Sequence, residues 1–222
     1  MKKVSFLQTV IALVKKDAQL ELRQQYALYG VILYMASTIF VIYLLHGRPE
    51  ATMWNSLFWI SQLFAATNAI AKSFLQESKG KLLYYYTISG AVPLITSKII
   101  FHVGLMLCMN LISILLFALF LGNPVLYLPY FLLLSSAGAM GLAILFTFLA
   151  AIAAKAQQQA AIMAIMGFPL LIPQLLLLQK LSLVAFSSVV QQGFWQLWGT
   201  LLGFQFLVVA LAVILFPFLW KD

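Results

Sequence analysis

The sequence contains very little charge and almost no cysteine. Of its 222 residues, 8% are charged and 64% are hydrophobic, and its single cysteine, Cys108, lies inside an apolar run. A soluble domain needs more charge on its surface than this, and one cysteine provides neither a disulfide framework nor a CxxC motif. The composition therefore predicts an integral membrane protein, since a chain of this length can supply several spanning helices of about 20 residues.

Residue patterns that support catalysis or ion coupling are also missing from the sequence. It has no GxxxxGK[ST] phosphate-binding loop, no paired carboxylates, no His/Cys cluster with metal-ligand spacing and no nucleophile elbow. No charged residue falls in the middle of a predicted span, which disfavours a proton- or sodium-driven transporter. We therefore predict a non-catalytic transmembrane subunit that binds no metal and no cofactor by itself, and that receives its energy from another subunit.

Long apolar runs separated by polar turns make up most of the chain. We predict six membrane spans, which form a single all-α transmembrane domain over residues 1–222. The predicted spans are residues 26–45, 53–71, 99–121, 128–154, 160–178 and 197–220. The second span carries uncharged polar side chains, and we expect them to face other helices, where an interhelical hydrogen bond contributes about 1 kcal/mol. These side chains are Asn55, Gln62, Thr67 and Asn68.

Residues 4–24 are predicted to form an amphipathic helix that lies in the membrane interface. Charged residues occur too often in this segment for a membrane span. Its apolar residues recur at the spacing of one helix face: Val4, Leu7, Val10, Ile11, Val14 and Ala18. An ordinary helix packed on a soluble domain is the alternative, and it is disfavoured because the chain offers no soluble domain to pack on.

The basic residues are distributed unevenly across the predicted membrane. With six spans both termini lie on one side, and that side holds 11 Lys and Arg residues, whereas the other side holds only Arg48 and Lys180. Basic residues accumulate on the cytoplasmic side of membrane proteins, so both termini are predicted to be cytoplasmic. The net charge of +8 is explained by this orientation in the lipid bilayer and not by nucleic-acid binding.

The polar segment at residues 72–98, between the second and third spans, is the main candidate site. It is far longer than a connection between two spanning helices requires, and its middle is apolar and aromatic although it lies outside the bilayer. We predict a short helix on the cytoplasmic face, a coupling loop that binds a partner. The alternative is an aromatic belt at the level of the lipid headgroups. The candidate partner-binding residues are Glu77, Lys79, Gly80, Lys81, Leu82, Leu83, Tyr84, Tyr85 and Tyr86.

Four further candidates concern helix packing. Gly138 and Gly141 belong to a run of small residues in the fourth span, and we predict that they lie at a helix contact because small residues let helices approach closely. Pro169 and Pro173 are predicted to kink the fifth span, because each proline removes a backbone donor.

The two histidines are candidates for ligating haem or a metal. His102 lies near the cytoplasmic start of the third span, and His46 lies at the outer end of the first. The alternative for each is an interfacial side chain that is hydrogen-bonded to headgroups or water. Neither histidine belongs to a cluster of ligand residues, so the sequence gives no confirmed haem or metal site.

Three stretches, taken together in their order and spacing, resemble one known family. They are Leu20-Glu21-Leu22-Arg23 before the first span; Phe74, Glu77, Gly80, Leu82, Pro93 and Lys98-x-x-x-His102 around the polar segment; and Phe168-Pro169-Leu170-Leu171-Ile172-Pro173 in the fifth span. This pattern resembles the cytochrome c maturation protein B family (CcmB, haem exporter protein B) over essentially the whole chain. The Lys-rich polar segment with its Tyr triplet departs from the more acidic segment of better-known members.

The resemblance implies the membrane permease subunit of an ABC transporter with ABC-2-type architecture. Such a subunit pairs with a separate ATP-binding subunit (CcmA-like), which carries the ATPase activity. It acts beside a haem-handling membrane subunit (CcmC-like) and a haem chaperone (CcmE-like) in cytochrome c biogenesis, in the bacterial cytoplasmic (inner) membrane. Haem is then a candidate cargo. The alternatives are an ABC-2-type permease for a lipid, polysaccharide or drug, and a scaffold that only assembles other subunits.

Overall fold

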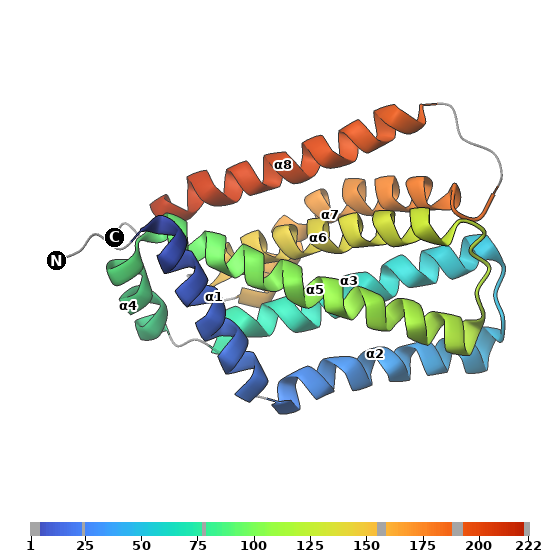
Figure 1. Cartoon of the computed structure of the whole chain (residues 1–222), viewed down its shortest axis with the longest axis horizontal. Helices are drawn as coiled ribbons and strands as arrows, with labels where there is room; N and C mark the ends of the chain where they lie inside the picture. Colours follow the sequence, from blue (N-terminus) through green and yellow to red (C-terminus); the bar gives the residue numbers. More distant parts are fainter. Residues whose placement is uncertain (1–4, 24, 77–78, 155–158, 188–192, 220–222) are drawn as a thin grey trace.

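The computed structural model describes the chain except for residues 1–4, 24, 77–78, 155–158, 188–192 and 220–222 (Figure 1). Every regular element in the described part is an α-helix. The helices are α1 (Phe6–Arg23), α2 (Gln25–His46), α3 (Ala51–Gln76), α4 (Lys79–Ser89), α5 (Ala91–Leu121), α6 (Leu128–Ala153), α7 (Gln159–Leu183) and α8 (Phe194–Leu219).

The long helices α2, α3, α5, α6, α7 and α8 run roughly along one common axis (Figure 1). The short helix α4 and the oblique helix α1 lie at one end of this bundle, where α8 also ends. Five of the long helices contain segments that are long and apolar enough to cross a membrane, and these segments are Tyr29–His46, Ala91–Leu121, Leu128–Ala153, Ile165–Leu183 and Phe194–Phe218. The prediction of an all-helical membrane protein is confirmed, whereas the second predicted span, residues 53–71 in α3, is not among the five found in the described part of the chain.

The polar side chains of α3 set it apart from the other long helices. Its 26 residues extend about 39 Å at 1.5 Å per residue, which exceeds the hydrocarbon thickness of about 30 Å. Asn55 and Gln62 are buried between helices as predicted. Thr67 and Asn68 instead donate hydrogen bonds to backbone carbonyls of α3 itself. The buried amides therefore lower the hydropathy of a helix that has spanning length.

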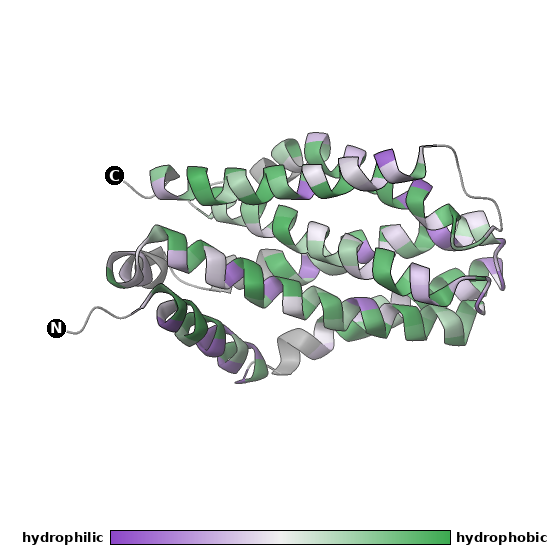
Figure 2. Cartoon of the chain, turned by 45° about the horizontal axis from the view of Figure 1, so that its top comes forward, coloured by the Kyte–Doolittle hydropathy of each residue, from purple (hydrophilic) through white to green (hydrophobic). Residues whose placement is uncertain are grey.

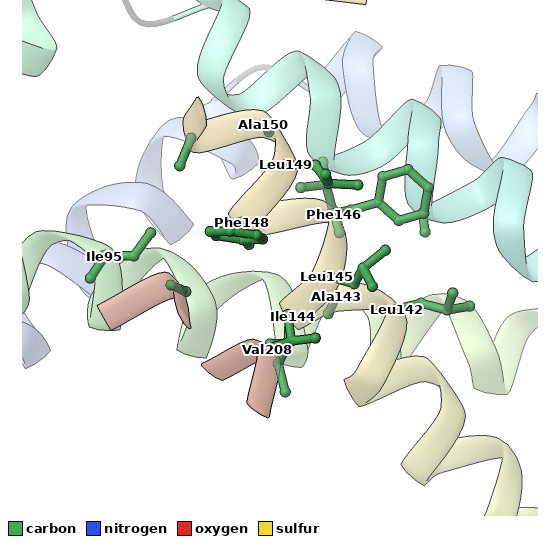
Figure 3. Packing of buried hydrophobic residues seen from close by; sticks show 14 of the residues in the cluster. Ile95, Leu142, Ala143, Ile144, Leu145, Phe146, Phe148, Leu149, Ala150 and Val208 are labelled. Atoms are coloured by element: carbon green, nitrogen blue, oxygen red, sulfur yellow. The ribbon is translucent and has the colours of Figure 1, made fainter. Parts of the chain in front are cut away.

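Helix α6 is the centre of the bundle and contacts α3, α5, α7 and α8. Each residue from Gly141 to Ala151 is buried. Figure 3 shows hydrophobic side chains of this stretch, such as Leu145 and Phe148, together with Ile95 of α5 and Val208 of α8. The mixture of large and small residues in α6 lets four helices pack around it, because the small ones leave room for the side chains of neighbouring helices.

The segment at residues 72–98 is mostly helical. It contains the predicted short helix, α4, but α3 continues to Gln76 and α5 begins at Ala91, earlier than the predicted start of the third span at residue 99. Gly90 alone connects α4 to α5, with φ +83°, a conformation that glycine adopts without steric cost. Pro93 lies in the first turn of α5, where its missing N–H is not needed.

Candidate functional site

Helix α4 is attached to the bundle through three neighbouring helices. Tyr85 and Tyr86 are half-buried against the hydrophobic core. The Tyr86 hydroxyl donates to the carbonyl of Pro217 in α8 at 3.2 Å, and Nζ of Lys16 in α1 lies 4.0 Å from the centre of the Tyr85 ring, a cation–π distance. Gly90 joins α4 directly to α5. One side of α4 is therefore occupied by contacts within the chain.

The opposite side of α4 faces away from the rest of the protein. Tyr84 is 61% exposed and Ile88 is 66% exposed, and their spacing of four residues places them on the same helix face. Thr87 beside them is also exposed. We call these three residues the outer face of α4. All three tyrosines were predicted to contact a partner. Because consecutive helical residues point in different directions, Tyr84 faces outward whereas Tyr85 and Tyr86 pack inward.

The remaining predicted residues of this segment cannot be assigned to a face. Glu77 lies outside the described residues. The backbone of the other five is helical, and the positions of their side chains are not described. These residues are Lys79, Gly80, Lys81, Leu82 and Leu83.

A buried ion pair joins α1 to α5 at the same end of the bundle. Nζ of Lys98 donates to Oδ1 of Asp17 at 3.2 Å, and the two side chains are 3% and 4% exposed. Nζ of Lys16 lies 3.0 Å from the same oxygen. The prediction that Lys98 belongs to a polar loop is wrong, because α5 begins before it. Asp17 went unrecognised, although it shares the buried face of α1 with Val10 and Leu13.

Lys98 is one of several polar residues that are buried on α5. His102, Asn110 and Ser113 follow it at helical spacing, and all four are buried. Such a stripe could have been recognised from the spacing Lys98-x3-His102-x7-Asn110 alone. It shows that the third predicted span is not uniformly apolar, and that its polar side is turned toward neighbouring helices.

His102 is fully buried between helices. The hydroxyl of Thr147 in α6 donates to the carbonyl of Ala143, so it accepts a hydrogen bond from Nδ1–H of His102, at 2.8 Å. The interfacial alternative is therefore wrong for His102. His46 is exposed at the far end of the bundle, so the two histidines are not brought together. Within the described ranges, no group of His, Cys, Asp and Glu side chains could hold a metal ion.

A network of amides and hydroxyls connects three helices in the middle of the bundle. Nε2 of Gln62 in α3 donates to Oδ1 of Asn110 in α5 at 3.1 Å, and Nδ2 of Asn110 donates to Oγ of Ser135 in α6 at 3.1 Å. Hydrogen bonds of this kind hold helices together where the surrounding medium is apolar.

A second network lies nearer the end of the bundle opposite α4. Nε1 of Trp59 donates to Oγ of Ser182 in α7 at 2.9 Å, and this hydroxyl lies 2.7 Å from Oδ1 of Asn55. Asn55 also donates to the carbonyl of Gln179 at 3.1 Å. These contacts fix α3 against α7.

Gly138 and Gly141 lie where α6 meets other helices. A Cβ at Gly138 would collide with side chains of α3 and α7, and one at Gly141 would collide with the amides of Gln174 in α7 and Gln205 in α8. Pro169 and Pro173 both lie inside α7; whether they kink it stays a prediction. The amide of Gln174 is fully buried and has no hydrogen-bond partner among the described residues.

These features define a class of protein: a multi-pass membrane protein whose buried polar groups join helices to one another. The family model described as CcmB protein matches residues 8–219. The chain therefore belongs to the CcmB family, whose members are ABC-transporter permease subunits concerned with haem transport in cytochrome c biogenesis. No curated protein and no solved structure matches the chain.

Proposed function

We propose that this chain is the membrane subunit of an ABC-type complex for haem export or haem-chaperone release, and that a separate ATP-binding subunit docks on the outer face of α4. The observation that carries this proposal is the division of α4 into two sides. One side is attached to α1, α5 and α8, while Tyr84 and Ile88 on the other are exposed. A helix attached in this way can pass a displacement from a partner to the bundle.

Burial of the outer face of α4 would be favourable. Removing apolar surface from water contributes about 25 cal/mol per Å², and aromatic side chains are frequent anchors of protein interfaces. Lys79 and Lys81, on the same helix, would steer an acidic partner toward it. A headgroup belt would occupy Tyr84 with lipid instead. The attachment of α4 to three helices favours the docking role. An aromatic belt at the level of the headgroups would not require α4 to be fixed to other helices.

The proposed topology has six spans and both termini in the cytoplasm of the bacterial inner membrane. We count α3 as a span in addition to the five apolar ones, since it has spanning length and lies among the other long helices. α1 lies in the membrane interface: Leu7 and Ile11 are exposed beside the buried Val10 and Leu13, and hydrophilic residues occupy another side of the helix (Figure 2). This is the arrangement of an ABC-2-type permease.

Cysteine labelling tests this topology in a Cys108→Ser background. Thr87→Cys on α4 is expected to react with an impermeant thiol reagent only after the cytoplasmic side is opened. Asn123→Cys, an exposed position between α5 and α6, is expected to react from the periplasm. Labelling of position 87 in intact cells would contradict the proposed orientation.

Haem is proposed as a cargo of the complex and not as a cofactor of this chain. His102 is enclosed between α5 and α6 and bonded to Thr147, so a haem iron could reach it only if the helices separated. We propose as partners the ATP-binding subunit, a CcmC-like haem-handling subunit and a CcmE-like haem chaperone. The catalytic groups for ATP hydrolysis are proposed to belong to the ATP-binding subunit.

The proposed docking role is tested by the double substitution Tyr84→Ala with Ile88→Ala. Truncating an interface anchor costs about 2 kcal/mol or more, equivalent to roughly 30-fold in affinity. We expect membrane insertion to persist and co-purification of the ATP-binding subunit to fall accordingly. The matched control is Leu126→Ala with Tyr127→Ala, because these two residues are also exposed and lie at the opposite end of the bundle. Equal recovery of the ATP-binding subunit from both variants would refute the docking surface.

A further inference from the structure

One carboxylate oxygen lies at the point where α1, α4 and α5 meet. Oδ1 of Asp17 is 3.2 Å from Nζ of Lys98 and 3.0 Å from Nζ of Lys16. Lys16 in turn lies over the ring of Tyr85. Asp17 thus contacts α5 directly and reaches α4 through Lys16, so a single side chain of α1 is linked to both helices.

The contacts of Asp17 lie where they can limit the movement of α4 relative to α5. α4 and α5 share only Gly90 as a covalent connection, and a single glycine leaves their relative angle free unless other contacts fix it. Lys98 lies one helical turn before His102 on the same buried face of α5. A displacement of α4 can therefore reach the interior of the bundle through Lys16, Asp17 and Lys98.

Burial makes the link sensitive to substitution. Lys98 and Asp17 are almost entirely removed from water. At such a buried site the attraction between opposite charges is stronger than at the surface, and an uncompensated charge is costly. Removing the carboxylate alone would leave the buried Lys98 ammonium near the partly exposed Lys16 ammonium, without the carboxylate that lies between them. Removing both charges of the buried pair would leave neutral side chains of similar shape, which such sites frequently tolerate.

We propose that Asp17 is a positioning residue that couples α4 to α5, so that force received on α4 is passed to the membrane helices. This inference rests on the proposed function, because it assumes that α4 receives a partner. In this proposal Asp17 and Lys98 contact neither that partner nor the cargo. Their role is to hold α4 at a fixed angle to α5.

The central test compares Asp17→Asn with the double variant Asp17→Asn and Lys98→Met. The single variant is expected to be less stable, and the double variant to recover wild-type melting. The double variant should also retain the ATP-binding subunit and hydrolyse ATP at a rate within about twofold of wild type. Its yield of mature cytochrome c per ATP hydrolysed should nevertheless fall about tenfold, which lies within the usual range of coupling between sites.

Spin labels at Thr87→Cys and Ile100→Cys, in a Cys108→Ser background, report the angle between α4 and α5 without any partner. Both positions are exposed. We expect a narrow distance distribution in wild type and a broad one in the double variant. Because this readout does not depend on the ATP-binding subunit, it separates a failure of the present inference from a failure of the proposed docking role.

Lys16→Gln provides a variant that leaves the buried pair intact and is expected to fold normally. It removes the contact with Tyr85, so it should broaden the same distance distribution and lower coupled activity severalfold. Asp17→Glu keeps the charge and should retain most of the coupling. A double variant with wild-type cytochrome c yield, or a narrow distribution in both the double variant and Lys16→Gln, would show that the ion pair serves stability alone. Loss of the ATP-binding subunit from the stable double variant would equally overturn the proposal.

Discussion

Gly138→Ala is expected to lower the free energy of unfolding by about 1–3 kcal/mol, the usual cost of overpacking a filled core, although it adds only one methyl group. The new Cβ would lie 2.6 Å from Cζ3 of Trp59 and 2.9 Å from Cδ2 of Leu178. Trp59 cannot move away easily, because it is buried, packs edge-on against Phe58 and donates its N–H to Ser182. Gly138→Leu is expected to prevent assembly of the bundle.

Reversible unfolding in mixed detergent micelles measures this effect. Gly104→Ala on α5 is the matched control, because a Cβ at that glycine meets nothing within 4 Å. It should be neutral or stabilising, since alanine favours a helix over glycine by up to about 1 kcal/mol. Gly141→Ala should fall between the two, because it displaces the ends of flexible glutamine side chains. Equal stability of the Gly138 and Gly104 variants would show that α6 does not pack on Trp59 as described.

Gly90→Ala is expected to abolish co-purification of the ATP-binding subunit while leaving every side chain of the outer face unchanged. Gly90 has φ +83° and ψ +161°, a region that is essentially restricted to glycine and costs other residues about 1–3 kcal/mol. Relief of this strain requires the joint between α4 and α5 to change its angle. The strain moves α4 to a different mean angle, whereas the double variant of Asp17 and Lys98 only broadens the distribution around the present angle. Tyr84 and Ile88 would therefore no longer be presented at their present position in Gly90→Ala.

Gly122→Ala, at the other end of α5, separates this effect from general destabilisation. Gly122 has nearly the same conformation, φ +80° and ψ +175°, and a Cβ at either glycine would make only ordinary contacts. Both variants should therefore lose a similar amount of stability, measured by unfolding in detergent. Only Gly90→Ala should lose the ATP-binding subunit and the maturation of cytochrome c. A similar loss in both variants would mean that stability, and not the angle of α4, limits assembly.

The features that depend on local sequence were predictable, and those that depend on which face of a helix is buried were not. Gly90 and the apolar segment before it predicted α4. The inward packing of Tyr85 and Tyr86 depends on α1, α5 and α8, which come from distant parts of the sequence. Lys98 was misassigned because a lysine in a polar segment is usually solvated. Its burial follows from the carboxylate of Asp17, 81 residues away.

The polar residues of α3 also show that the sequence predicts a buried side chain more readily than it predicts the partner of that side chain. Asn55 and Gln62 could be expected to face other helices, because amides are costly to expose to lipid. Their partners, Ser182 and Asn110, could not be inferred, since nothing in the spacing of one helix specifies which helix lies beside it. The spacing of the polar residues in α5 predicts a polar stripe on one face of that helix. The residues of α1 and α6 that contact this stripe can be identified only from the folded structure.

The most direct test of the central claim is photo-crosslinking from position 84 in the assembled complex. A photoreactive phenylalanine analogue replaces Tyr84 in one variant and Tyr127, at the opposite end of the bundle, in another. The account predicts a covalent adduct with the ATP-binding subunit from position 84 and none from position 127. Adducts from position 84 that contain only lipid, or capture of the ATP-binding subunit from position 127, would contradict it.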